Sequence, residues 1–289
     1  MKRFLILSLL VLAGCGEAAD TAKVDQHLET EDVFAKLSQR FLPIFKEQGE
    51  ILNNLKVITD QQAEIIVDAY QTKHVHWDAN FNTLGLPLNG LSSITNNQAE
   101  TLGEVRYNPE KDEFCTLYLN GLKSINEEQA KGLSKAEDLE LNGLTSISDK
   151  QAESLSSLLS LELNGMTSIT SKQAESLSKV GSLTLNGLTS ITDEQAENLG
   201  KLEYRLELNG LSSITDQQAE SLSKVRQLIL DGLTSITDPQ AESLSKVEDF
   251  LGLGGLTSTT DQQAKSLSKA GWLYTSEDLQ PLIDKYKKQ

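Results

Sequence analysis

The sequence predicts an α/β solenoid, a stack of similar units that each contain one short strand and one short helix. A related segment recurs nine times between Leu52 and Leu267, and its step from Asn142 to Asn164 and on to Asn186 is 22 residues. Most units carry a Leu-x-Leu pair, and all carry a polar residue followed three positions later by Gln. A period of this length is typical of solenoids, in which neighbouring units bury a continuous core.

The Leu-x-Leu pair predicts the strand of each unit. Leu183 and Leu185 alternate with Ser182, Thr184 and Asn186. Because successive side chains of a strand point to opposite faces, we expect the leucines to face the core and the other residues to face outward. Stacked units then join their outward residues into one sheet surface.

The Thr-x-x-Gln pair predicts the helix that follows. In the unit around Thr192 and Gln195, the spacing fits a capping box that opens a short helix, and Ala196 and Leu199 return to the core. We expect this start in all nine units. The pairs are Thr59/Gln62, Thr95/Gln98, Asn126/Gln129, Ser148/Gln151, Thr170/Gln173, Thr192/Gln195, Thr215/Gln218, Thr237/Gln240 and Thr260/Gln263.

Together these motifs resemble the leucine-rich repeat family, and the stretch from Ile191 to Leu199 is similar to its cysteine-containing subclass, with Leu188 where that subclass keeps Cys. The resemblance implies a parallel sheet on the concave face and short helices on the convex face. The array then covers residues 51–270. Most family members stabilise the turn after the strand with an Asn or Cys that this chain lacks. We therefore expect the Asn directly after Leu-x-Leu to pair along the stack as a ladder.

The first residues carry a secretion signal, since Met1-Lys2-Arg3 precedes an apolar run from Phe4 to Leu12. This run is shorter than the roughly 20 residues that span a bilayer. The tetrad Leu12-Ala13-Gly14-Cys15 resembles a bacterial lipobox, which implies removal of residues 1–14 and lipidation of Cys15. Gly16 after the cysteine favours the outer membrane. The alternative is an ordinary secretory signal.

Atypical units are expected at both ends of a solenoid, because the core would otherwise be exposed there. Residues 15–28 are predicted as the lipidated cysteine and its tether, and residues 29–50 as a helical cap. A second cap is predicted over residues 271–289, with a helix from Ser276 to Lys288 and with Trp272 and Tyr274 sealing the end; a ligand role for these two residues is the alternative. Cys115, the second of two cysteines, is expected to be a small, partly buried residue, with intermolecular pairing as the alternative.

The charge limits the classes of partner. The formal net charge is −16, and −18 once Lys2 and Arg3 are removed. This charge argues against nucleic acid and against direct contact with anionic lipid, so membrane attachment is expected through the acyl chains alone. A cationic partner is favoured, although negative charge also keeps a secreted solenoid soluble.

The outward residues of the predicted strands are the best candidates for binding a partner, because they vary while the frame stays constant. Several of them are acidic or aromatic. The alternative is an ordinary solvated sheet surface. The candidates are Tyr118, Asp138, Glu140, Glu162, Thr184, Arg205, Glu207 and Ile229.

Two insertions, near residues 70–83 and 106–113, separate a helix from the next strand and are expected to project from one edge, where insertions often mark a binding face. Their distinctive residues form the second set of binding candidates. A metal site could use the histidines with the aspartate, but three ligands in one loop are a poor signal, and no metal or other cofactor is predicted. The candidates are His74, His76, Trp77, Asp78 and Tyr107.

The sequence contains no arrangement typical of an enzyme. His27, His74 and His76 are the only histidines, and the glycines fall in repeat turns, away from any phosphate-binding motif. We therefore predict a lipid-anchored protein of the bacterial cell envelope that binds a macromolecule, most simply a protein, and has no small-molecule substrate. The alternatives are a structural spacer of the envelope and, more distantly, a metal-dependent enzyme built on the histidine loop.

Overall fold

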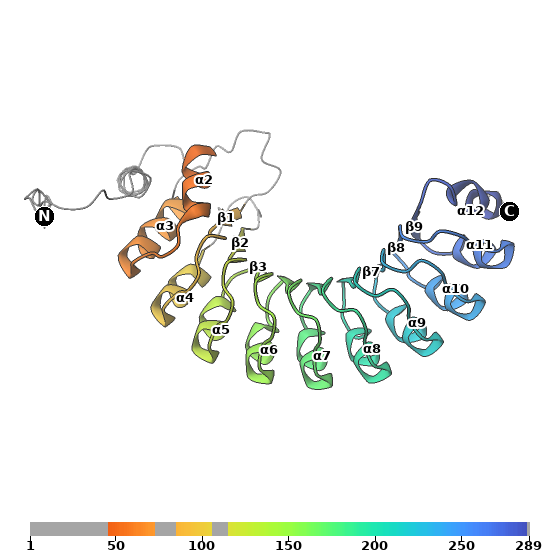
Figure 1. Cartoon of the computed structure of the whole chain (residues 1–289), viewed down its shortest axis with the longest axis horizontal. Coiled ribbons are helices and arrows are strands. Elements are labelled where there is room, and N and C mark those ends of the chain that lie inside the picture. Colours follow the sequence, from red (N-terminus) through yellow and green to blue (C-terminus); the bar gives the residue numbers. More distant parts are fainter. Residues whose placement is uncertain (1–45, 73–84, 106–114, 288–289) are drawn as a thin grey trace, which may run out of the picture.

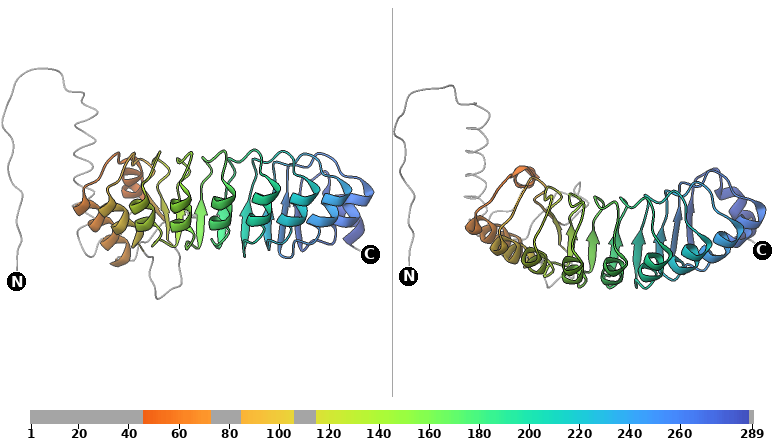
Figure 2. Two further views of the ribbon diagram at one scale, coloured as in Figure 1. Left: turned by 90° about the horizontal axis from the view of Figure 1, so that it is seen from below. Right: turned by 60° about the horizontal axis from the view of Figure 1, so that its bottom comes forward.

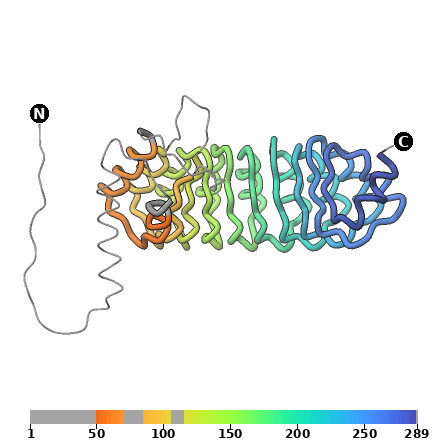
Figure 3. Tube along the Cα trace, turned by 90° about the horizontal axis from the view of Figure 1, so that it is seen from above, coloured from red at the N-terminus to blue at the C-terminus, as the bar shows by residue number. Residues whose placement is uncertain are grey.

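The computed structural model describes residues 46–72, 85–105 and 115–287. Its chain forms an arc, with the strands along the inner side and the helices along the outer side (Figure 1). Viewed from above and below, the units follow one another in sequence order along the arc (Figures 2 and 3). The predicted α/β solenoid, with a concave parallel sheet and convex helices, is confirmed.

All nine strands belong to one parallel sheet in the order β1 to β9. Neighbouring strands pair in register, so that Leu161 lies beside Leu183 and Glu140 beside Glu162. Leu183 and Leu185 are fully buried, as the alternation predicts. The strands are β1 (Gly85–Pro87), β2 (Thr116–Tyr118), β3 (Asp138–Glu140), β4 (Ser160–Glu162), β5 (Ser182–Thr184), β6 (Arg205–Glu207), β7 (Gln227–Ile229), β8 (Phe250–Leu253) and β9 (Trp272–Thr275).

The helices lie on the convex side, and those of the nine units each begin with the predicted capping box. In the first unit the Thr59 amide donates to Gln62 Oε1 at 2.8 Å and the Gln62 amide donates to Thr59 Oγ1 at 3.2 Å. The helices of the nine units are α3 (Asp60–Thr72), α4 (Asn96–Gly103), α5 (Glu127–Leu133), α6 (Asp149–Leu155), α7 (Ser171–Leu177), α8 (Asp193–Leu199), α9 (Asp216–Leu222), α10 (Asp238–Leu244) and α11 (Asp261–Leu267).

The first unit departs from the others at its strand position. Leu52, fully buried, lies in the helix α2 (Lys46–Asn54), and the sheet begins only with β1 in the next unit. Asn53 nevertheless keeps the role of its counterparts, because its Oδ1 accepts a hydrogen bond from the amide of Asn89 at 3.3 Å. The polar link between units therefore starts in a helix and continues along the strands.

The C-terminal end differs from the expectation. Trp272 and Tyr274 are 72% and 55% exposed, so the prediction that they seal this end is wrong. Strand β9 pairs in register with β8, which directs Leu273 and Thr275 inward and leaves the two aromatic rings on the concave side. The end is covered by α12 (Gln280–Lys287), which begins four residues later than predicted and buries Ile283.

Several predictions concern residues outside the described part of the chain. The signal and Cys15, most of the N-terminal cap, and the insert candidates lie there. Cys115 is described and is 1% exposed, more deeply buried than predicted. Within the described ranges, no helix combines the length and the hydrophobicity needed to cross a membrane.

Candidate partner-binding face

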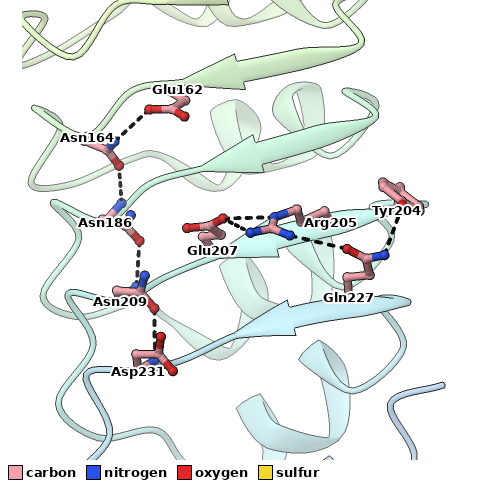
Figure 4. A network of polar contacts seen from close by, with 9 residues as sticks. All are labelled: Glu162, Asn164, Asn186, Tyr204, Arg205, Glu207, Asn209, Gln227 and Asp231. Atoms are coloured by element: carbon pink, nitrogen blue, oxygen red, sulfur yellow. Dashed lines mark hydrogen bonds and ion pairs between the residues drawn. The ribbon is translucent and has the colours of Figure 1, made fainter. Parts of the chain in front are cut away.

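An asparagine ladder fixes the edge of the concave sheet where the strands end (Figure 4). The side-chain oxygen of Asn142 accepts a hydrogen bond from the amide of Asn164 at 2.8 Å, and Asn164 does the same for Asn186 at 2.9 Å. The predicted ladder therefore exists, but its rungs join a side chain to a backbone. Asp231 continues it, since its Oδ1 accepts from the amide of Gly254 at 2.6 Å.

The ladder also holds two carboxylates on the concave face. Glu140 Oε2 accepts from the side-chain amides of Asn120 at 2.9 Å and Asn142 at 3.4 Å. Glu162 Oε2 accepts from Asn142 and from Asn164, both at 3.2 Å. Because the oxygen of each asparagine is already bound to the next unit, its NH₂ group is directed toward the glutamates. The two side chains are thus oriented by the fold itself.

Negative charge accumulates around these glutamates. Partial burial raises the pKa of Glu140, the hydrogen bond from Asn120 opposes that shift, and repulsion from Glu162 adds to it. Partial burial, with repulsion from Glu137, also raises the pKa of Asp138. A positive charge placed among these carboxylates would lower the pKa of both Glu140 and Asp138 again. We call Asp138, Glu140 and Glu162 the acidic patch.

No basic side chain of the described residues forms an ion pair with the acidic patch. The next acidic residue along the concave face is different. Glu207 accepts from Arg205 Nε at 2.9 Å and from its Nη2 at 2.5 Å, within the same strand (Figure 4). Arg205 therefore neutralises Glu207, whereas the acidic patch keeps its charge for a partner.

Other predicted residues lie on the same face with different exposure. Tyr118 is half-buried because its ring lies over Gly85, where a Cβ would come within 2.3 Å of Cε2. Thr184 is half-buried in the middle of the sheet. Ile229 is only 7% exposed, with its side chain over Gly252, so it presents little surface for the predicted contact with a partner. Glycine at 252 leaves room that the isoleucine fills.

Trp272 and Tyr274, predicted from the sequence to seal the C-terminal end, instead present exposed rings on this face beside the half-buried Phe250. Phe250, Trp272 and Tyr274 lie on β8 and β9, and we call them the aromatic patch. The rings of Phe250 and Trp272 meet edge to face, with centroids 6.1 Å apart. Their position at alternate residues beside Leu251 and Leu273 was the signal that could have placed them on the concave side.

The described residues contain no cluster of three or more histidine, cysteine, aspartate and glutamate side chains arranged to hold a metal ion. The histidine loop lies outside these ranges. The concave face therefore offers charge, amide groups and aromatic surface. These are the means of binding, and we derive no catalytic step from them.

A solved structure resembles this fold, although no protein-family model matches the sequence and no curated protein is significantly similar to it. The leucine-rich repeat-containing protein LegL7 from Legionella pneumophila superimposes with a TM-score of 0.56 at 16% identity, over 86% of this chain and 90% of that one.

Two internalins from Listeria monocytogenes match less closely. Internalin inlF has a TM-score of 0.46 at 17% identity, over 80% of this chain and 64% of its own. Internalin C2 has a TM-score of 0.44 at 18% identity, over 76% of this chain and 84% of its own. This chain thus spans somewhat less than two thirds of the inlF structure. With its parallel nine-stranded sheet and its likeness to LegL7, the chain has the α/β leucine-rich repeat solenoid fold.

Proposed function

We propose that this protein binds another protein on its concave face, through a cationic segment that lies over the acidic patch. The observation that carries this proposal is that Glu140 and Glu162 are held side by side by the ladder and have no basic partner among the described residues. Carboxylates in a half-buried site form stronger hydrogen bonds to arginine and lysine than fully exposed ones do. Electrostatic complementarity of this kind sets partner choice and speeds association.

We further propose that the array works at the bacterial cell envelope, attached by lipid on Cys15. The support for this proposal is the sequence Leu12-Ala13-Gly14-Cys15 and the apolar run before it, which resemble a lipoprotein signal. Two or three acyl chains give durable anchoring, so the array itself needs no contact with lipid. Gly16 favours the outer membrane. Mass spectrometry of the protein purified from the membrane fraction tests this, since an intact Met1 would contradict it.

The binding proposal is tested by capturing partners from envelope and medium extracts. The Glu140→Gln/Glu162→Gln variant removes two charges from the concave face and keeps the side-chain shape. Glu153→Gln/Glu175→Gln is the matched control, because it removes the same charge in the same two units from exposed positions on α6 and α7. We expect a partner retained by the unaltered protein and the control and lost by the concave variant. Absence of any specific partner favours the structural spacer.

A further inference from the structure

We propose that the bound partner segment has two parts, a basic part on the acidic patch and an apolar part on the aromatic patch. This inference rests on the proposed function and specifies the chemistry of the partner. The two patches lie on one continuous sheet, the acidic patch on β3 and β4 and the aromatic patch on β8 and β9. A single polypeptide segment can therefore cross the strands and contact both.

The aromatic patch is unusually exposed for its size. Trp272 at 72% and Tyr274 at 55% present large apolar surface to water from the concave side of β9. Elsewhere the residues at these two strand positions are mainly small, polar or charged, such as Ser182 and Thr184. Tryptophan and tyrosine dominate the energetics of protein interfaces, because they bury much apolar area and each carries a polar group.

The aromatic patch has no charge of its own. The concave positions of β8 and β9 hold Phe250, Gly252, Trp272 and Tyr274. Between the two patches, Arg205 and Glu207 neutralise each other. The Asp231 carboxylate, which accepts from the Gly254 amide, lies at the edge of the sheet beside Tyr274. Apart from this group, the concave face changes along the arc from acidic to neutral to aromatic, and a complementary segment changes from basic to neutral to apolar.

Strand spacing sets the length of that segment. Five strand steps separate Glu162 on β4 from Trp272 on β9, which corresponds to about 24 Å at roughly 4.8 Å for each step. An extended polypeptide covers this distance with about seven residues. The concave residues between them include Ser182, Thr184, the Arg205–Glu207 pair and Gln227, whose amide is bonded to the Tyr204 hydroxyl at 3.0 Å (Figure 4).

Charge complementarity selects a polypeptide over a neutral polysaccharide. A sugar polymer could stack on the aromatic rings, but it would leave Glu140 and Glu162 without a positive partner. A segment with arginine or lysine at one end and apolar side chains at the other satisfies both patches at once. Joining the two contacts in one chain also strengthens binding, because the second contact forms at a high effective concentration.

Model peptides test the inference on the whole chain. Each dye-labelled peptide has three arginines at one end and three leucines at the other, in both chain directions. One pair carries a nine-residue Gly/Ser linker, whose extended reach of about 30 Å spans the patches, and the other joins the arginines directly to the leucines, so that its six residues extend about 20 Å and do not span them. Fluorescence anisotropy gives affinity. In a Trp77→Phe background Trp272 is the only tryptophan, so its emission reports contact with the leucines.

We expect the long-linker peptide in one direction to bind at least tenfold more tightly than its linker-free counterpart and to shift the Trp272 emission to shorter wavelength. Trp272→Ser/Tyr274→Ser and Glu140→Gln/Glu162→Gln should each abolish that advantage. The matched controls are Val57→Ser, which removes an exposed apolar side chain outside the concave face, and Glu153→Gln/Glu175→Gln. Both control variants should keep the affinity advantage of the long-linker peptide. An unchanged circular dichroism spectrum shows that each variant is folded.

The outcomes separate the two proposals. Affinity that depends on Glu140 and Glu162 but neither on linker length nor on the aromatic patch overturns this inference and leaves the proposed function standing. Affinity that depends on neither patch, or no binding by any peptide, contradicts both. A shift of Trp272 emission by a neutral oligosaccharide, without any shift by the peptides, would assign the aromatic patch to a glycan and overturn the inference as well.

Discussion

At the scale of single residues, the turn glycines set how closely the units stack. A Cβ at Gly143 would lie 2.2 Å from the carbonyl oxygen of Asn120 and 2.4 Å from that of Leu122, both in the preceding unit. These atoms belong to the backbone and cannot move aside as a side chain could. The Asn-Gly pair therefore couples the ladder to a close backbone approach in the same turn.

Replacing Gly143 with alanine should lower the free energy of unfolding by about 1–3 kcal/mol, the usual cost of overpacking. Denaturant titration followed by circular dichroism measures it. Ser146→Ala, an exposed change in the same turn region, is the control and should stay within about 0.5 kcal/mol of the unaltered protein. A Gly143→Ala protein as stable as the control would show that the units can separate to admit the methyl group.

Glu140 gives stability a pH dependence that runs opposite to that of a salt-bridged carboxylate. Its pKa is raised in the folded state, chiefly by burial, so ionisation opposes folding. The contribution of Glu140 to stability is complete below its ordinary value of 4.5 and is lost as the pH rises through the folded-state pKa. Glu140→Gln should therefore be more stable than the unaltered protein at pH 7, and the difference should shrink by pH 4.

Unfolding titrations of both proteins at the two pH values check this prediction. The Glu153→Gln change on the exposed side of α6 serves as the control, with little difference at either pH. If Glu140→Gln were less stable at pH 7, the ionised carboxylate would have to gain more from Asn120 and Asn142 than it loses by burial.

At the scale of the helices, one glutamine in each unit after the first has two structural roles. Gln173 Oε1 accepts from the Thr170 amide at 2.9 Å, which completes the capping box of α7. Its Nε2 donates to the carbonyl oxygen of Ile147 in the preceding unit at 2.7 Å. The same side chain therefore starts its own helix and ties it to the unit before.

In the described structure, the glutamine of the first unit has only the capping role, so this unit can be compared with the others. Gln62 makes the capping box of α3, but no preceding unit of the described chain supplies a carbonyl for its Nε2. Gln62→Ala should cost about 1 kcal/mol, the value of a cap. Gln173→Ala should cost about 2–4 kcal/mol, because the carbonyl of Ile147 is also left without its bond. Parallel denaturant titrations compare the two, and equal losses would mean that the bond between units contributes little.

At the scale of the whole molecule, the array is a chain of similar interfaces. Each helix packs beside the helices of the adjacent units, and each strand pairs only with its sequence neighbours. Stability is then close to a sum over units and over the interfaces between them. The positions of the two patches along the arc follow from the number of units that lie between them.

Deleting residues 182–204 removes one unit and joins Gly181 to Arg205. We expect a folded protein with a single unfolding transition and with an m-value lower by about a tenth, because less surface is buried. The deletion also brings the acidic and aromatic patches about 4.8 Å closer. Circular dichroism and denaturant titration measure the first effect. Loss of cooperative unfolding would show that this unit has a role its neighbours do not share.

Much of this architecture could be predicted from the sequence, because it repeats. Alternation around Leu183 and Leu185 identified the strand, and the spacing of Thr192 and Gln195 identified the helix start. The second bond of each glutamine was not predicted, since its acceptor is a carbonyl of the preceding unit, 26 residues away for Gln173 and Ile147. Patterns within one unit do not show which backbone atoms of the next unit they meet.

The candidate face shows the same division. The sequence placed Glu140 and Glu162 on the concave side, and the structure added the amides that orient them. It placed Ile229 there too, but this side chain is buried over Gly252. It assigned Trp272 to a sealing role, whereas the strand pairing of β9 leaves that ring exposed. Each correction depends on a neighbour across the sheet.

The sequence by itself determined the solenoid, the length of its units, the start of each helix and the alternation of core and surface residues. The reason is that hydrophobic periodicity and capping act between residues close together in the chain. Tertiary structure decided which carboxylates lack a basic partner in the described chain, which rings remain exposed and where the glycines are needed. These properties depend on contacts between units, and such contacts exist only after the units have stacked in register.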